Sequence, residues 1–169
     1  MVIAETDRLR LRQLAPSDAA FLCRLLNEPS WLQNIGDRDV RTVEDAERYI
    51  HSKIMESYRT LGFGMNLVES KTGCEPMGVC GLVKRDALPV PDIGFAFLPE
   101  FWGQGYAFEA ASALMRDAEV SLGLNRLLAI VSPGNDASCR LLEKLGFKSE
   151  GHFRLNPEDK ELELYAVAI

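Results

Sequence analysis

The segment from Asp92 to Met115, DIGFAFLPEFWGQGYAFEAASALM, limits the possible fold more than any other part of the sequence. An apolar stretch typical of a strand is stopped by Pro99, which cannot donate a hydrogen bond to a neighbouring strand. The turn from Gly103 to Gly105 follows, and alanine and leucine residues at helical spacing then predict a helix. A strand that leads through a short loop into a helix predicts an α/β chain.

The glycine turn between this strand and this helix is a predicted anion site. The first N–H groups of a helix have no partner within it, and they lie at the positive end of the helix dipole. Glycines lack the Cβ atoms that would keep an anion away, so the junction favours a phosphate group. The sequence has no Gly-Lys-Ser/Thr of a P-loop, and Phe108 stands where a dinucleotide fingerprint needs its third glycine. Both common nucleotide loops are therefore excluded.

The rest of the chain also alternates predicted strands and helices. Ser17 and Thr42 are expected to cap two helices that end at Pro29 and Gly62, and Gly146 is expected to end a third. The predicted strands are 8–14, 63–70, 77–84, 92–98, 126–131, 147–155 and 162–169, and the predicted helices are 17–28, 42–61, 106–122 and 135–145. The second and third strands predict a hairpin, and the last two predict an antiparallel pair.

Charge and composition narrow the class of protein. The 169 residues carry a net charge of -6, which disfavours nucleic-acid binding and favours a cationic partner such as an amine. The four cysteines form no C-x-x-C pair and there are only two histidines, so neither a metal site nor a disulfide framework is expected. The first 12 residues lack a signal-peptide core, and no apolar run approaches the roughly 18 residues of a membrane span. We expect a cytoplasmic protein without a membrane or nucleic-acid partner.

Two blocks carry a resemblance to a known family. The first is W-G-Q-G-Y-A, Trp102–Ala107, and the second is NDASCRLLEKLGF, Asn135–Phe147. The first resembles the Gln/Arg-x-x-Gly-x-Gly/Ala motif of the GNAT N-acetyltransferase superfamily, with Trp102 in place of Gln/Arg. The second is similar to the N-x-x-S-x-x-x-x-E-K-L-G-F block of the RimJ/RimL-like branch of that superfamily. In this branch a tryptophan is usual at the first position of the glycine motif, where Trp102 stands here. The founding members of that branch acetylate N-terminal amino groups of ribosomal proteins.

The resemblance implies a fold. It predicts a single α/β (α+β) domain over residues 1–169, with a mixed, mostly antiparallel twisted sheet flanked by helices. The sheet is expected to have about six to seven strands and to be splayed in the middle, where it would hold CoA. A monomer and a homodimer are both compatible with it.

The resemblance also implies acetyl-CoA as the cofactor. Its pyrophosphate is expected on the N–H groups of residues 103–107, and its pantetheine arm beside the strand that ends near Phe97 and Leu98. Asn135 and Ser138 are expected near the pantetheine and the reacting sulfur, although an ordinary N-cap and a solvated first-turn serine would explain them too. Tyr106 either covers the cofactor or packs at the helix start. The predicted contacts are Phe97, Leu98, Trp102, Gly103, Gln104, Gly105, Tyr106, Ala107, Asn135 and Ser138.

Acetyl transfer to an amine needs a neutral amine, stabilisation of the oxyanion and a proton for the leaving thiolate. Family position makes Ser138 the expected general acid, with Tyr165 as the alternative, and backbone N–H groups near Leu98 are expected oxyanion donors. Trp31, in an exposed loop or short helical turn, is expected to line an acceptor pocket. No general base stands out; the candidates are Glu100, Asp92, Glu150 and His152.

The predicted function is transfer of an acetyl group from acetyl-CoA directly to a primary amine, either a protein N-terminal α-amine or a small-molecule amine. About a fifth to a third of an α-amine is neutral near pH 7.4, against about 0.1% of a lysine amine. Because no strong base is apparent, the sequence favours the weakly basic amines over lysine. The alternative function is a non-catalytic domain that binds or senses acyl-CoA.

Overall fold

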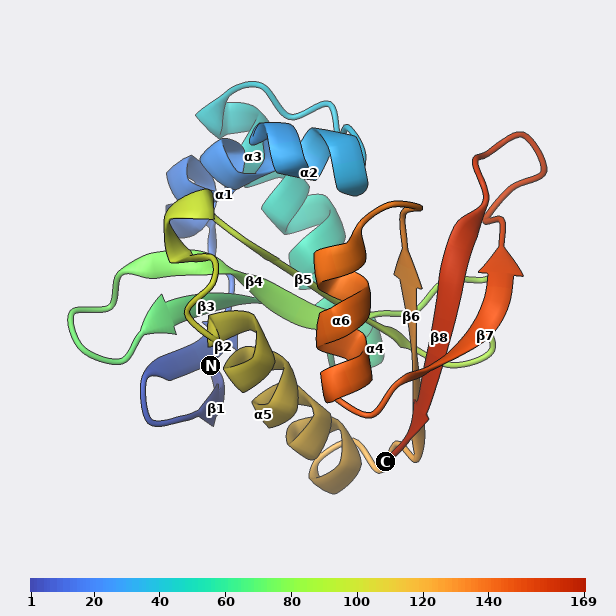
Figure 1. Cartoon of the computed structure of the whole chain (residues 1–169). Helices are drawn as coiled ribbons and strands as arrows, with labels where there is room; N and C mark the ends of the chain where they lie inside the picture. Colours follow the sequence, from blue (N-terminus) through green and yellow to red (C-terminus); the bar gives the residue numbers. More distant parts are fainter.

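One sheet runs through the computed structural model, which describes residues 1–169 (Figure 1). Its strands lie in the order β1-β2-β3-β4-β5-β6-β8-β7, and only the β5–β6 pair is parallel. The strands are β1 Val2–Glu5, β2 Leu9–Gln13, β3 Met65–Ser70, β4 Pro76–Val83, β5 Asp92–Phe97, β6 Arg126–Val131, β7 Lys148–Phe153 and β8 Leu162–Ala168. The predicted mixed, mostly antiparallel α/β sheet is confirmed, with 8 strands because β1 adds one that was not predicted.

Helices cover both faces of the sheet. They are α1 Ala19–Leu26, α2 Pro29–Asn34, α3 Val43–Tyr49, α4 Met55–Leu61, α5 Tyr106–Val120 and α6 Asp136–Lys144. Helices α1, α2 and α3 enclose one apolar core with Leu67 and Val79, whereas α5 and α6 enclose another with Val68 and Cys80. Figure 1 shows α5 and α6 together in front of the sheet, with α1, α2 and α3 gathered at one end. None of the helices is both long and apolar enough to cross a bilayer.

The two parallel strands, β5 and β6, meet only where they begin. Their register contains the single pair Asp92–Leu128, beside a hydrogen bond of 3.1 Å from the Leu128 N–H to the Pro91 carbonyl. Beyond that pair the strands separate toward their ends at Phe97 and Val131. We call these unpaired portions the β5/β6 fork. The predicted splay in the middle of the sheet is therefore confirmed.

Two helix predictions need correction. Ser17 is not the cap of α1, because Pro16–Asp18 form a 3-10 turn and Asp18 takes the cap position. The helix predicted over 42–61 is present as one helical run, but its middle segment, Ile50–Ile54, is π-helical and divides it into α3 and α4. The wider turn of this segment keeps both end residues, Ile50 and Ile54, in the core. Thr42 does cap α3, and Gly62 ends α4 with a φ of 79°.

A partly buried ion cluster joins β2 to the first helical turn. Arg12 donates two hydrogen bonds of 2.9 Å to the Asp18 carboxylate and one of 3.0 Å to Glu69 on β3. The Ala15 N–H donates a further bond of 2.8 Å to Asp18. Burial alone would raise the pKa of Asp18, but these donors outweigh it and hold the pKa below its usual value. The cluster fixes the helical layer to the sheet.

We predict that Asp18→Asn destabilises the protein more at pH 7 than at pH 3. Because the folded-state pKa lies below the unfolded value, the ionised carboxylate stabilises the fold above about pH 4, and that stabilisation disappears as the pH falls through the folded pKa. The loss at pH 7 should be about 1–3 kcal/mol, less than for a fully buried pair, because Arg12 still reaches solvent. Urea unfolding at the two pH values measures it. The exposed, unpaired Glu44 supplies the control Glu44→Gln, and equal effects of both substitutions would contradict the prediction.

Candidate active site

The end of β5 presents backbone groups to the fork. The Leu98 N–H donates to the Met77 carbonyl at 3.0 Å, and the Leu98 carbonyl accepts from the Phe101 N–H at 3.0 Å. Both polar groups of Leu98 are therefore engaged within the chain. Successive residues of a strand direct their N–H groups to opposite neighbours, so the N–H of Phe97 faces the separating strand β6. The expected oxyanion donor moves from Leu98 to Phe97.

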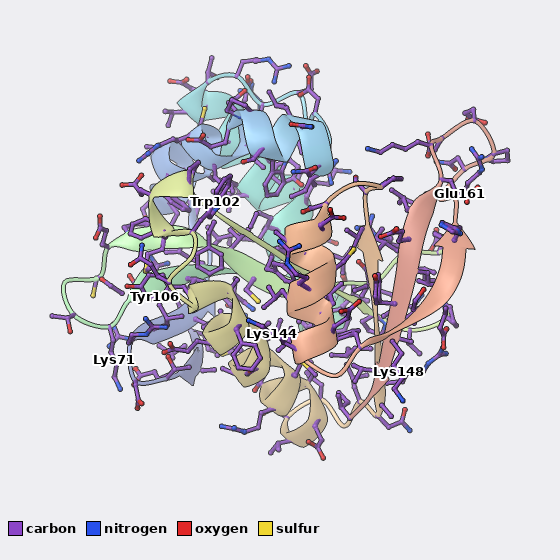
Figure 2. All side chains as sticks on the ribbon, in the orientation of Figure 1. Lys71, Trp102, Tyr106, Lys144, Lys148 and Glu161 are labelled. Atoms are coloured by element: carbon purple, nitrogen blue, oxygen red, sulfur yellow. The ribbon has the colours of Figure 1, made fainter.

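The loop after β5 is tied back to the end of that strand. The indole Nε1 of Trp102 donates to the Phe97 carbonyl at 2.8 Å, and Gln104 Nε2 donates to the Glu100 carbonyl at 3.1 Å. Figure 2 labels Trp102 in this loop and Tyr106 at the start of α5. We call this indole hydrogen bond the Trp102 latch. It satisfies the Phe97 carbonyl, while the Phe97 N–H stays directed toward the fork.

The glycine turn opens the start of α5. Gly103 has a φ of 72°, and Gly105, the N-cap of α5, has a φ of 83°. A Cβ placed on Gly103 would meet no atom within 4 Å, so the space beside the turn is open. The first N–H groups of α5, from Tyr106 and Ala107 onward, have no partners within the helix. The arrangement fits an anion of phosphate size.

Arg8, which the sequence analysis did not identify, holds this turn in place. Its Nη1 donates to the Gln104 carbonyl at 3.0 Å, and its Nε donates to Glu109 at 2.7 Å. The guanidinium carbon lies 4.3 Å from the centre of the Tyr106 ring. Tyr106 therefore packs against Arg8 at the helix start. The contacts of Arg8 with Gln104 and Glu109 join residues about 100 positions apart, so the sequence did not reveal them. The alternation of arginine and leucine around Arg8 indicated only an exposed charge.

α6 begins beside the end of β6. Asn135 caps it, with its Oδ1 accepting from the Ser138 N–H at 3.4 Å, so the expected structural role of Asn135 is present. Ser138 is half-buried, and its hydroxyl makes no hydrogen bond within the chain. Tyr165 is buried on β8, where hydrogen bonding to Cys139 and burial raise its pKa. The raised pKa makes Tyr165 a weaker acid than an ordinary tyrosine, and the choice between Ser138 and Tyr165 as proton donor stays a prediction.

Two other predicted residues are placed differently from expectation. Glu100 is exposed and forms a 2.6 Å ion pair with Arg24 of α1. Trp31 lies in α2 and is only 8% exposed, so its predicted surface position is wrong: the tryptophan packs into the helical core. Its Nε1 has no hydrogen-bond partner. A role for Trp31 in acceptor binding stays a prediction.

Comparison with known proteins identifies the family. Residues 8–148 match the model of the acetyltransferase (GNAT) domain. The chain belongs to the GNAT acetyltransferase family. This acetyltransferase is 30% identical over 154 residues to the uncharacterized N-acetyltransferase YoaA of Bacillus subtilis (strain 168), which covers 90% of this chain and 86% of the relative.

Solved structures share the fold of this acetyltransferase. RimL, a ribosomal L7/L12 α-N-protein acetyltransferase in complex with coenzyme A, has a TM-score of 0.84 at 23% identity and covers 100% of this chain and 98% of its own. The ribosomal-protein-S5-alanine acetyltransferase of Vibrio fischeri has a TM-score of 0.80 at 18% identity, covering 97% and 94%. At these identities the likeness shows that the chain shares their fold.

We predict that Gly103→Ala weakens CoA binding. A Cβ at a positive φ costs about 1–2 kcal/mol and would intrude on the open space beside the helix start. Gly123 is the matched control, with a φ of 66°, no atom within 4 Å of an added Cβ, and a position after the far end of α5. Both alanine variants should lose similar stability in urea unfolding, but only Gly103→Ala should raise the CoA Kd in calorimetry. Equal Kd values would overturn the assignment of the turn.

Proposed function

We propose that this GNAT acetyltransferase transfers the acetyl group of acetyl-CoA directly to a primary amine, either a protein N-terminal α-amine or a small-molecule amine. The observation that carries the proposal is the β5/β6 fork, which ends beside an open glycine turn at the start of α5. One bound ligand could therefore contact both the unpaired edge of β5 and the phosphate-sized anion site at the glycine turn.

The residues of the fork and the turn fit CoA. The N–H groups from Gly103 to Ala107 would hold the pyrophosphate, on a turn that Arg8 fixes through the Gln104 carbonyl. The unpaired edge of β5 at Phe97 would pair with the amide groups of the pantetheine arm. The Asn135 side chain at the start of α6 would contact the same arm from the other side of the fork. When bound, acetyl-CoA supplies the activated acetyl group as a thioester.

Two groups of this chain would serve the transfer itself. The Phe97 N–H is fixed by the Trp102 latch and would stabilise negative charge on the acetyl oxygen. The free Ser138 hydroxyl would give a proton to the leaving sulfur. No cysteine or serine is paired with a histidine as an activated nucleophile, and direct transfer needs none. The chain therefore holds and orients both substrates without forming a covalent intermediate.

The experiment that tests the function measures CoA thiol release from acetyl-CoA with a panel of amines. We expect release with peptides bearing a free α-amine or with small amines of similarly low pKa, and much less with peptides whose only amine is an internal lysine. The physical reason is the larger neutral fraction of the less basic amines near pH 7.4. Comparable turnover with lysine peptides would contradict the preference.

The alternative function, a non-catalytic acyl-CoA-binding domain, gives a different result in the same experiment. It predicts that CoA raises the Tm, by about 2.7 kcal/mol of added stability at 100 times Kd, while no amine releases thiol. A protein whose Tm does not respond to CoA would exclude both functions.

We predict that Ser138→Ala lowers kcat about 100-fold, because a positioned proton donor contributes at least this much. Its Kd for CoA should change little, since the Asn135 cap bonds to the Ser138 backbone and not to its hydroxyl. The exposed Ser121, beyond the end of α5, supplies the control Ser121→Ala. If Ser138→Ala keeps full kcat, Ser138 is not the proton donor, and the proton must come from Tyr165 or water.

A further inference from the structure

The general base is unassigned, and the candidates from the sequence are already engaged. Each forms an ion pair within the chain, which would have to be broken or shared before the group could take a proton. The pairs are Glu100–Arg24 at 2.6 Å, Asp92–Arg85 at 3.0 Å, Glu150–Arg126 at 2.9 Å and His152–Glu161 at 3.5 Å. Asp92 also lies at the closed end of the fork, where β5 and β6 still pair.

Glu163 on β8 is different from these carboxylates. It is half-buried and has no lysine, arginine or histidine partner. Among the carboxylates that are not exposed, only Glu163 and Asp117 lack such a partner, and Asp117 lies in the last turn of α5, away from its N-terminus. The one hydrogen bond to the Glu163 carboxylate comes from the thiol of Cys139, at 3.0 Å.

The sheet places Glu163 next to the fork. Glu163 lies directly opposite Val131, the last residue of β6, and Val131 lines the same core as Tyr165 and Cys139. Side chains opposite each other on antiparallel strands have Cβ atoms about 4.5–5.5 Å apart. Cys139 follows Ser138 on α6. The carboxylate therefore lies between the strand that borders the fork and the helix that carries the predicted acid.

The surroundings of Glu163 suit a group that receives a proton from a cation. Cys139, Asp136 and Glu143 face this region from α6, Tyr165 from β8 and His152 from β7. All but His152 are neutral or acidic, so the local potential attracts an ammonium group. Burial and the neighbouring Glu163 raise the pKa of Cys139, which keeps the thiol protonated and able to orient the carboxylate.

We propose that Glu163 is the general base for the acceptor amine, positioned by Cys139. This inference rests on the proposed function. The Glu163 carboxylate takes one proton from the acceptor ammonium, directly or through one water, and leaves a neutral amine. The amine nitrogen then bonds to the acetyl carbon, the carbon–sulfur bond breaks, and the thiolate takes a proton from Ser138. The second amine proton passes to solvent, Ser138 regains a proton from solvent, and Glu163 releases its proton to solvent, so one proton is released overall and no oxidant or further reactant is needed.

The test compares Glu163→Gln with the unchanged protein in the thiol-release assay. With an α-amine acceptor at pH 7, we expect kcat/KM to fall about 10²- to 10⁴-fold, the usual contribution of a general base. The deficit should shrink as the pH rises past the amine pKa, and it should be small for hydroxylamine, which is already neutral at pH 7. Glu163→Asp should retain part of the activity. The Kd for CoA should stay unchanged in both variants.

Glu161→Gln is the matched control, because Glu161 precedes β8 by one residue and is exposed, near the β7–β8 connection (Figure 2). It should keep full activity. Glu163→Gln with unchanged kcat/KM, or with an equal loss for hydroxylamine and at high pH, would overturn the inference, since a structural role would lower all rates alike. Absence of turnover in the unchanged protein, with CoA still bound, would instead refute the proposed function and this inference with it.

Discussion

The separation of β5 from β6 is the constraint on which the rest of the structure depends. A sheet interior normally pairs its backbone groups on both sides, and unpaired buried groups are costly. Here the two central strands share a single residue pair and then diverge, leaving the polar groups of Phe97 without a strand partner. The chain limits the cost by giving the Phe97 carbonyl to Trp102. The Phe97 N–H remains directed toward the fork, where the proposed thioester arm would accept from it.

Contacts from distant parts of the chain keep this open region rigid. Arg8, before β2, fixes the glycine turn through Gln104 and Glu109. The Ser132 hydroxyl, just after β6, donates to the Asn34 carbonyl at 2.5 Å, which ties the end of α2 to the other side of the fork. Because both edges are anchored, the proposed cofactor would find the fork already formed, and such preorganisation favours binding.

Local chemistry made much of this architecture predictable. Pro99 ends a strand, Gly103 and Gly105 require positive φ, and the strand periods are short-range patterns, so β5, the turn and α5 follow from neighbouring residues. The proposed cofactor site at the glycine turn depends mainly on such short-range patterns. The sequence analysis did not include Glu163 among the candidate bases, because its position beside the fork depends on the β6–β8 register and on Cys139, 24 residues away. Trp31 was misplaced because burial of a single aromatic residue depends on helices that pack over it.

The Trp102 latch also gives the protein two very different indoles. Trp102 is 54% exposed and hydrogen-bonded at one edge to the strand that borders the fork, whereas Trp31, the only other tryptophan, is buried in an apolar core. The emission of a buried apolar indole is blue-shifted relative to that of a wet one. The fluorescence spectrum of the native chain therefore contains a component that reports on the mouth of the proposed cofactor site and another that reports on the folding of the helical layer.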